Sequence, residues 1–500
     1  MGKEVADIES PSKTSIENGA EPSSPPQLVS TTERKLMAKI DMHILPVLCV
    51  LYLLAFLDRV NISNAVIFGL REDLKIVSGT QYNTALTIFF IPYILFEIPS
   101  NILLKKLRPH VWLSLCMFLF GFVTLVQGFV KNYAGLLTTR FFLGLFETGM
   151  FPGCFYLMGM WYKRTEAQKR FSFFFSSTTL AGAFGGLLAG AIGKMDGMSG
   201  YRGWRWIFIL EGVLTCVIAV AWFFLIPDFP EDVKWMNEEE RAFIQAKLAK
   251  DVGTAGHHVS LTWKDVLDVL KDVKIFLGGL MYFGMIVPAY SYAYFAPTII
   301  KTFGYSAIET QLYSIPPWAV AFAVAMILAY FSDRLQHRFA FAVLPIFIAV
   351  AGFAIVLNVH GVATRRVQYF ALFLITSGAF SAMPIIVCWF AMNLSGHKRR
   401  SVGTGWQVGF GNIGGIIATY SFIQKDSPRF IPGHSICLAF LVFSALMCMA
   451  YLALLMYRNK SRDKAAAAGV VQADDADLTP EQKRERDLLG DMNPEYRYQL

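Results

Sequence analysis

Residues 43–65 read HILPVLCVLYLLAFLDRVNISNA, a run that is apolar as far as Leu57 and then continues through a charged pair, Asp58 and Arg59. A helix needs roughly 20 mostly apolar residues to cross a bilayer. A helix from His43 that stopped at Leu57 would have only about fifteen residues, which is too short to cross. We therefore predict a membrane-spanning helix that carries both charged side chains inside the membrane.

The composition of the whole chain also indicates a membrane protein. Of its 500 residues 55% are hydrophobic and only 16% are charged, and the mean hydropathy is +0.45. Soluble proteins have roughly 25% charged residues. These values exclude an intrinsically disordered protein, a secreted disulfide scaffold and an ordinary soluble enzyme. The first apolar run begins near His43, behind a polar stretch, so we expect no cleavable signal peptide.

Eleven further apolar segments follow the first, and each must be helical because a backbone in lipid has to satisfy its own hydrogen bonds. The predicted spans lie at about 43–65, 81–103, 111–130, 134–161, 171–193, 205–226, 275–300, 311–331, 340–358, 367–392, 402–424 and 434–457. A polar gap divides them into six and six. It contains a predicted soluble helix after Asn237, and a second such helix is predicted after Thr479.

This pattern predicts five regions of the chain. They are a disordered cytoplasmic N-terminal tail (1–40), a six-helix bundle (41–227), a cytoplasmic linker with an amphipathic helix (228–273), a second six-helix bundle (274–458) and a cytoplasmic C-terminal tail (459–500).

The two halves resemble each other at a nearly constant offset. Lys105 ends the second span and Asp333 ends the eighth, 228 positions later. The motif Gly182-x-x-x-Gly186 of the fifth span has its counterpart 229 positions later, at Gly411-x-x-x-Gly415 of the eleventh. The predicted fold is an all-α membrane protein with twelve transmembrane helices in two pseudo-symmetric six-helix bundles. Such a parallel repeat places a binding site at mid-membrane between the halves.

Lysine and arginine set the predicted orientation. Most clusters of lysine and arginine lie in the loops that are cytoplasmic if the N-terminus is cytoplasmic. We therefore expect both termini to be cytoplasmic. The net charge of +8 lies in these short loops, so we expect anionic lipid as their partner and no nucleic acid. The seven cysteines all lie in apolar stretches without a CxxC pair. Packing is therefore expected for them, with no metal or cofactor.

Four charged residues are predicted to meet inside the first half. Arg140 and Glu147 of the fourth span are seven residues apart, so two helical turns place them on one face. The direction of that span puts Arg140 at the depth of Asp58 and Arg59, and Glu147 near the middle. A charge at such a depth costs at least about 2.5 kcal/mol and should face a cavity or a partner. A working site is favoured, and a neutralised structural pair that locks helices together is the alternative.

These residue types suit proton and anion chemistry. A carboxylate in a low-dielectric cavity can carry a proton at physiological pH. Arginine stays charged, and its planar fork fits the carboxylate of a substrate. A proton on the acid would free the arginine for the anion, so the two binding events would favour one another. The sequence thus leads to a hypothesis of proton-coupled anion symport.

Other candidates are weaker. Glu97, near the inner end of the second span, suits a gate or a structural role better than substrate contact, and Glu211 of the sixth span suits a structural role. Four further residues could either line a cavity or serve ordinary packing or helix crossing. They are Tyr290 and Tyr294 of the seventh span, Trp389 of the tenth and Asn412 of the eleventh.

Eight motifs resemble those of the major facilitator superfamily. They are LDRVNISNA (57–65), FEIPSNILLKKLRPHVW (96–112), RFFLGLFETGMFPG (140–153), WYKRTEAQKR (161–170), GWRWIFILEG (203–212), FSDRLQHR (331–338), GFGNIGG (409–415) and DSPRF (426–430). Within the superfamily the chain is most similar to the anion:cation symporters and their fungal allantoate permease branch. Members of that branch take up allantoate, nicotinate, pantothenate, biotin and similar organic acids.

The resemblance implies roles for particular residues. Asp58 and Glu147 match the acids that bind protons in symporters of this family, and Arg59 and Arg140 match the arginines that engage the anion. FSDRLQHR resembles the cytoplasmic loop motif that latches the inner gate, through Asp333, Arg334 and Arg338. The first-half copy departs from that motif, with Lys105 where Asp is usual, as is common in the fungal branch.

The predicted function is therefore proton-coupled transport of a small organic anion by alternating access. The expected partners are that anion, protons and the lipid bilayer, and the protein is expected to act as a monomer. Two alternatives stay open: an exporter of an organic acid or secondary metabolite, and a non-transporting nutrient receptor on the same fold. An enzyme is not expected, because most of the eight histidines lie at span ends or in loops and no catalytic constellation is visible. The expected location is the plasma membrane, with the vacuolar membrane as the alternative.

Overall fold

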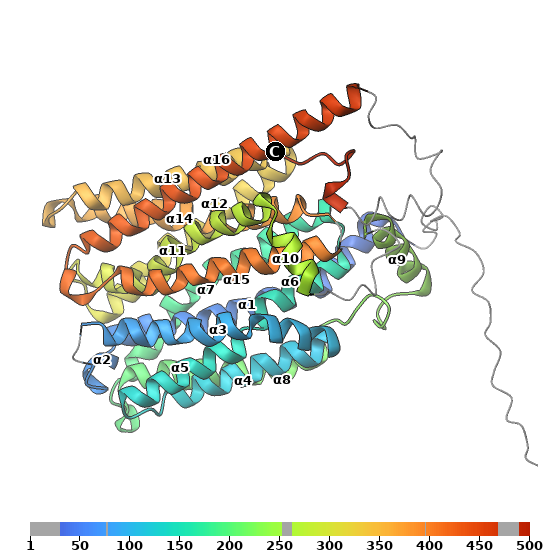
Figure 1. The fold of residues 1–500 in the computed structure, drawn as a ribbon. Helices are drawn as coiled ribbons and strands as arrows, with labels where there is room; N and C mark the ends of the chain where they lie inside the picture. The colour runs from blue at the N-terminus through green and yellow to red at the C-terminus, as the bar shows by residue number, and fades with distance from the viewer. Residues whose placement is uncertain (1–30, 77–78, 253–262, 396, 469–489) are drawn as a thin grey trace, which may run out of the picture.

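The computed structural model describes residues 31–76, 79–252, 263–395, 397–468 and 490–500, and in these ranges it is helical throughout (Figure 1). Ten helical stretches are long and apolar enough to cross a membrane. Two more long helices, α3 (Gln81–Lys106) and α15 (His397–Ser421), lie among them. These helices lie at the positions of the twelve predicted spans. The predicted helix after Thr479 and residues 1–30 of the predicted tail lie outside the described residues.

The first bundle contains the spans of the first half. Its helices are α1 (Glu33–Ile67), α3, α4 (Pro109–Gln127), α5 (Tyr133–Glu147), α6 (Met150–Trp161), α7 (Arg164–Ile192) and α8 (Gly203–Leu225), with the short α2 (Leu70–Asp73) after α1. The helix α1 begins well before the apolar run at His43, so residues 33–40 are helical where the sequence predicts disorder. This extension is held at its Lys39, which forms an ion pair with Glu240 at 2.8 Å.

The fourth span is two helices, α5 and α6, where the sequence predicts one continuous helix over 134–161. They join at Thr148 and Gly149. The Thr148 hydroxyl donates to the carbonyl oxygen of Tyr93 at 2.5 Å. A Cβ on Gly149 would lie 2.6 Å from Ser100 Oγ and 2.7 Å from Trp112 Nε1. The junction therefore packs too tightly against its neighbours for a larger residue.

The second bundle contains the spans of the second half. Its helices are α11 (Val273–Lys301), α12 (Ala307–Leu335), α13 (Arg338–Asn358), α14 (Arg365–Met392), α15 and α16 (Ile431–Ala467). Two linker helices connect the bundles: α9 (Glu238–Val252), in the place predicted after Asn237, and α10 (Trp263–Leu270). Short 3₁₀ helices occupy Gly193–Met195, Met198–Gly200, Val362–Thr364, Gln424–Asp426 and Gly490–Met492. We call the end of the molecule that carries α9 and α10 the linker end, and the opposite end the far end (Figure 1).

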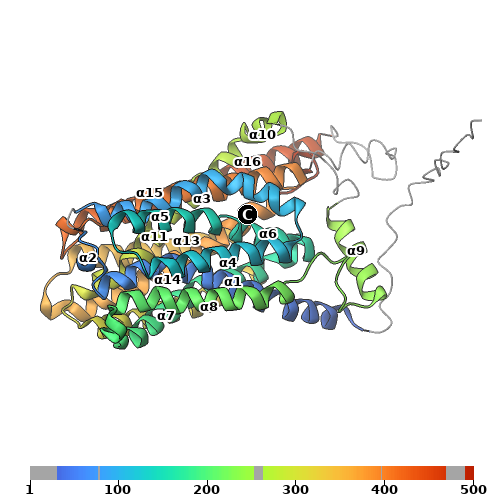
Figure 2. The same cartoon turned by 90° about the horizontal axis from the view of Figure 1, so that it is seen from below.

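The bundles meet along two seams, α7 against α12 and α3 against α15. Figures 1 and 2 show α3 and α15 side by side. Glycines allow the close approach. A Cβ on Gly182 would overlap the Trp318 ring, and one on Gly186 would lie 2.5 Å from Ser314 Oγ. A Cβ on Gly415 of α15 would overlap the ring of Phe90 of α3. The two predicted glycine motifs are thus not equivalent, because Gly411 faces Tyr282 of α11, inside its own bundle.

Hydrogen bonds join α3 to α15 and the loop after it at the far end. Asn83 Nδ2 donates to the carbonyl oxygens of Thr419 at 2.5 Å and Phe422 at 3.0 Å. The hydroxyls of Thr87 and Thr419 lie 2.6 Å apart. Near the same end, Arg71 Nη1 donates to Gln424 Oε1 at 2.5 Å. The structure therefore shows the two bundles joined by polar contacts at the far end.

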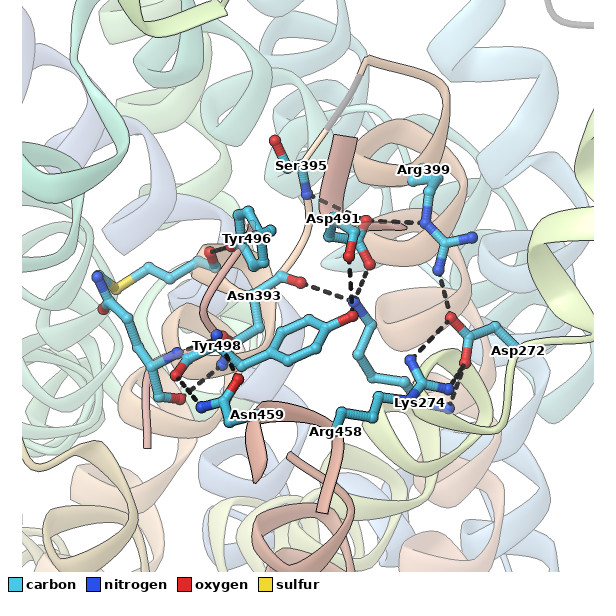
Figure 3. A network of polar contacts seen from close by, with 12 residues as sticks. Asp272, Lys274, Asn393, Ser395, Arg399, Arg458, Asn459, Asp491, Tyr496 and Tyr498 are labelled. Carbon is cyan, nitrogen blue, oxygen red and sulfur yellow. Dashed lines mark hydrogen bonds and ion pairs between the residues drawn. The ribbon is translucent and has the colours of Figure 1, made fainter. Parts of the chain in front are cut away.

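Residues 490–500, part of the predicted C-terminal tail, pack against the linker end of the second bundle (Figure 3). Asp491 is fully buried between Lys274 and Arg399, with Arg399 Nε 2.8 Å from its Oδ1. Arg399 and Arg458 both pair with Asp272. Burial raises the pKa of Asp272, but hydrogen bonds from Arg458 and from the Lys274 amide outweigh it and lower the pKa to about 2. Long-range ion pairs therefore hold this segment in place.

Candidate functional site

Arg59 lies at the centre of a buried polar cluster between the two bundles. Its Nε donates to Glu147 Oε1 at 2.9 Å, and its Nη2 donates to the same oxygen. Its Nη1 donates to the hydroxyl of Tyr290, which belongs to the second bundle. The Arg59 and Glu147 side chains are 2% and 1% exposed. One arginine therefore links an acid of the first bundle to a tyrosine of the second.

Aromatic rings surround this guanidinium. The Arg59 Cζ lies 5.0 Å from the ring centroid of Phe89, 5.2 Å from that of Tyr93 and 5.5 Å from that of Tyr290. Such contacts stabilise a cation where water is excluded. Phe89 and Tyr93 were missed at the level of sequence, although their spacing of four residues on one helix face is visible there. In a span this rich in aromatic residues that spacing is equally typical of packing.

Arg140 is the second buried cation of the cluster, and it is only partly used. Its Nη2 donates to the backbone carbonyl oxygen of Arg59 at 3.0 Å, and its Cζ lies 5.7 Å from the Phe89 ring centroid. Its Nε and Nη1 are buried without a hydrogen-bond partner among the described residues, as are Tyr294 OH and Glu147 Oε2. The Tyr294 ring stacks on that of Tyr290, with the two ring centroids 6.0 Å apart. The site thus contains unpaired donors from both bundles, and buried polar groups in proteins are almost always paired.

Asp58 does not join this cluster, in contrast to the predicted convergence of all four charges. Successive residues of a helix point about 100° apart, so Asp58 and Arg59 face different neighbours. Asp58 Oδ2 accepts a hydrogen bond from Thr215 of α8 at 3.0 Å. Glu211, also on α8, accepts from Asn61 of α1. The carboxyl group of Asp58 therefore lies inside the first bundle, in the same contact of α1 with α8 that holds Glu211.

The remaining predicted site residues lie in three other places. Glu97 is buried on α3, and neither of its carboxyl oxygens is hydrogen-bonded to a residue that the structure describes. A Cβ on Gly409 of α15 would lie 3.3 Å from its Oε2. Asn412 is buried on α15. Trp389 is at the linker end, where its Nε1 donates to the carbonyl oxygen of Gln499 at 3.0 Å. It therefore packs against the C-terminal segment and not in the Arg59 cluster.

The predicted gate residues of the second bundle also lie at the linker end. Arg338 is buried and forms an ion pair with Asp333 at 2.8 Å. It also donates to Ser332 Oγ at 3.0 Å. Arg334 is exposed, and its Nη1 donates to the hydroxyl of Tyr330 at 3.1 Å. Asp333 and Arg338 are thus paired with each other within one bundle.

A helical bundle with buried charges and unpaired donors between two repeats is the architecture of a membrane transporter. The Major Facilitator Superfamily profile matches residues 48–419. The chain belongs to this superfamily, whose members are secondary transporters and not enzymes.

Relatives and solved structures agree with this assignment. The chain is 35% identical to MFS transporter prlL of Fungal sp. (strain NRRL 50135), over 85% of this chain and 87% of that protein. It is 32% identical to the high-affinity nicotinic acid transporter of Saccharomyces cerevisiae, over 93% of this chain and 85% of that protein. Its fold is similar to the inward-facing, unoccupied crystal structure of a bacterial homologue of the human lysosomal transporter Spinster. That match has a TM-score of 0.59 and 16% identity, and it covers 82% of this chain and 96% of the other.

Proposed function

We propose that this transporter couples the uptake of a small organic anion to protons. The observation that supports the proposal best is the partly used guanidinium of Arg140. Two of its donors and the hydroxyl of Tyr294 are buried without partners. A carboxylate is the ligand that such donors fit, because it accepts two parallel hydrogen bonds from an arginine and neutralises its charge.

The coupling follows from the bond between Arg59 and Glu147. With Glu147 ionised, Arg59 is held by the acid, and an incoming anion would meet the negative charge of Glu147 beside Arg140. A proton on Glu147 removes that charge and releases Arg59 for the anion. Proton and anion each raise the affinity for the other, as linkage requires.

The position of the cluster connects binding to alternating access. Arg59, Arg140 and Glu147 belong to the first bundle, whereas Tyr290 and Tyr294 belong to the second. A ligand that contacts both sets is sensitive to the relative position of the bundles. In this proposal residues 41–227 and 274–458 are the moving bodies and 228–273 is their cytoplasmic linker. The linker-end pair of Asp333 and Arg338 and the unpaired Glu97 serve as gate elements.

A flat aromatic carboxylate is the substrate class we favour. The rings of Phe89, Tyr93 and Tyr290 lie around Arg59, and that of Tyr294 stacks on Tyr290. Aromatic faces also stack on flat ligands. The yeast relative named as a nicotinic acid transporter makes nicotinate the first probe. We further propose the plasma membrane as the location, cytoplasmic termini and function as a monomer.

The test is uptake of labelled nicotinate, and of a panel of monocarboxylates, vitamins and ureides, into proteoliposomes with an inward proton gradient. Wild-type protein should accumulate at least one of these anions and lose the accumulation when a protonophore collapses the gradient. Arg140→Lys should reduce uptake by at least about tenfold, since a bidentate contact to a charged group is worth more than 1 kcal/mol. Glu147→Gln should abolish the response to the gradient and keep anion exchange.

Two substitutions at exposed positions serve as controls, Arg366→Lys and Glu309→Gln, and neither should change uptake. Uptake by wild-type protein that is the same with and without the proton gradient would refute the coupling. Binding of the anion without flux would instead identify a receptor.

A further inference from the structure

A second buried acidic site lies within the first bundle, where α1 meets α8. Asp58 and Asn61 are three positions apart on α1, and Glu211 and Thr215 are four positions apart on α8, so each pair occupies one helix face. The two faces are in contact. Thr215 Oγ1 donates to Asp58 Oδ2 at 3.0 Å, and Asn61 Nδ2 donates to Glu211 Oε2. Two carboxyl groups thus occupy adjacent levels of one helix–helix contact.

Neither carboxyl group forms an ion pair within the described part of the chain. Asp58 is 0% exposed and Glu211 is 2% exposed. One oxygen of each, Asp58 Oδ1 and Glu211 Oε1, is buried without a hydrogen-bond partner. Glu147 on α5 also interacts electrostatically with Asp58, while the hydroxyl of Thr124 on α4 donates to the carbonyl oxygen of Phe120 at 3.0 Å. The neighbouring cation, Arg59, is already bound by Glu147.

The amide of Asn61 has a fixed orientation. Its Oδ1 accepts from Asn64 Nδ2 at 3.4 Å, which turns its own Nδ2 toward Glu211. This bond occupies one oxygen of Glu211 and leaves the other free. The bond to Glu211 gives Asn61, which belongs to the NISN sequence of the first span, a role outside the proposed anion site.

Two like charges buried side by side without a cation are strongly unfavourable, and a single proton relieves both the repulsion and part of the desolvation. We propose that Asp58 and Glu211 form one proton-holding pair, in which Glu211 is the positioning residue that keeps a proton on Asp58. Its role in coupling rests on the proposed proton-driven uptake. The charge on one partner favours the protonated form of the other, so the pair exchanges one proton at a higher pH than a single buried acid without that neighbour.

The test is the pH profile of uptake in proteoliposomes, with Glu211→Gln and Glu211→Asp compared with wild type. Gln still accepts the hydrogen bond from Asn61 but removes the negative charge. The pH of half-maximal uptake should therefore fall by about one unit or more in Glu211→Gln, with KM at acidic pH unchanged. Glu211→Asp should restore the wild-type midpoint, and the exposed control Glu309→Gln should not move it.

Infrared spectroscopy tests the pair without substrate. Purified wild-type protein at neutral pH should show the C=O band of a protonated carboxyl group, and Asp58→Asn should weaken that band. The band should disappear at a lower pH in Glu211→Gln than in wild type. If Glu211→Gln does not fold, wild type and Asp58→Asn still test whether Asp58 holds the proton, and Glu211→Asp tests the part of Glu211.

The two proposals fail in different ways. Wild-type uptake without any response to the proton gradient refutes the proposed function, whereas the infrared band still reports on the pair. Coupled wild-type uptake with an unchanged pH midpoint in Glu211→Gln refutes only the pair. An infrared band that Asp58→Asn leaves intact also refutes the pair.

Discussion

Arg140 and Arg59 differ in what their guanidinium groups can still bind. Arg59 is saturated by Glu147, Tyr290 and three aromatic rings. Arg140 uses one donor on a backbone carbonyl and keeps two free. A buried donor without a partner costs about 1–3 kcal/mol, and a transporter recovers that cost when the substrate arrives. In the proposed mechanism this asymmetry makes Arg140 the anion-binding arginine and Arg59 the coupling arginine.

Tyr294→Phe tests this separation at the level of one atom. The Tyr294 hydroxyl has no partner in the described structure, so its removal should leave the thermal unfolding midpoint nearly unchanged. It should raise KM for the transported anion by about tenfold, because a hydrogen bond to a charged ligand is lost. Tyr290→Phe is the comparison, since it deprives Arg59 of its bond and should alter the coupling. Equal KM in Tyr294→Phe and wild type would exclude that hydroxyl from the site.

At the level of helices, the sequence predicts the number of spans but not how each is rotated about its axis. Length alone requires that the first span include Asp58 and Arg59. The direction of each side chain depends on how α1 packs against α5 and α8, and residues distant in sequence decide that. The position of Trp389 was unpredictable for the same reason. Residues 490–500 cover Trp389 and are held by ion pairs of Asp491 with Lys274 and Arg399. The paired residues are about a hundred or more positions apart in the sequence.

Gly415→Val tests the contact between α3 and α15. A side chain at Gly415 would overlap the buried ring of Phe90, and overpacking costs about 1–3 kcal/mol. Since this seam closes the far end, we expect a transport rate at least about tenfold lower, from protein that still folds. Gly405→Val on the same helix is the control, because a Cβ there meets nothing within 4 Å. Wild-type transport by Gly415→Val would show that close approach at this point is not needed.

In the whole molecule, hydrogen bonds join the α3–α15 seam at the far end, and residues of both bundles form the Arg59 cluster. Polar contacts between the bundles gather at the far end, at Asn83, Thr87 and Thr419, while the Arg59–Tyr290 bond joins them at the cluster. The ion pair of Asp333 with Arg338, which we propose as a gate element, lies inside one bundle, so it does not join the bundles. Alternating access then requires that the far-end contacts break in each cycle, because a ligand must reach the cluster from that side too.

A reversible cross-link at the far end tests that requirement. The hydroxyl oxygens of Thr87 and Thr419 are 2.6 Å apart, so cysteines in both positions lie within reach of a disulfide, whose sulfurs are about 2.05 Å apart. Oxidation of Thr87→Cys/Thr419→Cys should stop uptake, and reduction should restore it, whereas each single variant should transport under both conditions. The native cysteines lie in apolar helix interiors and are mostly buried, so they should not interfere. Uptake that continues with the disulfide fully formed would mean that the far end never has to open, and the alternating-access mechanism would fall with it.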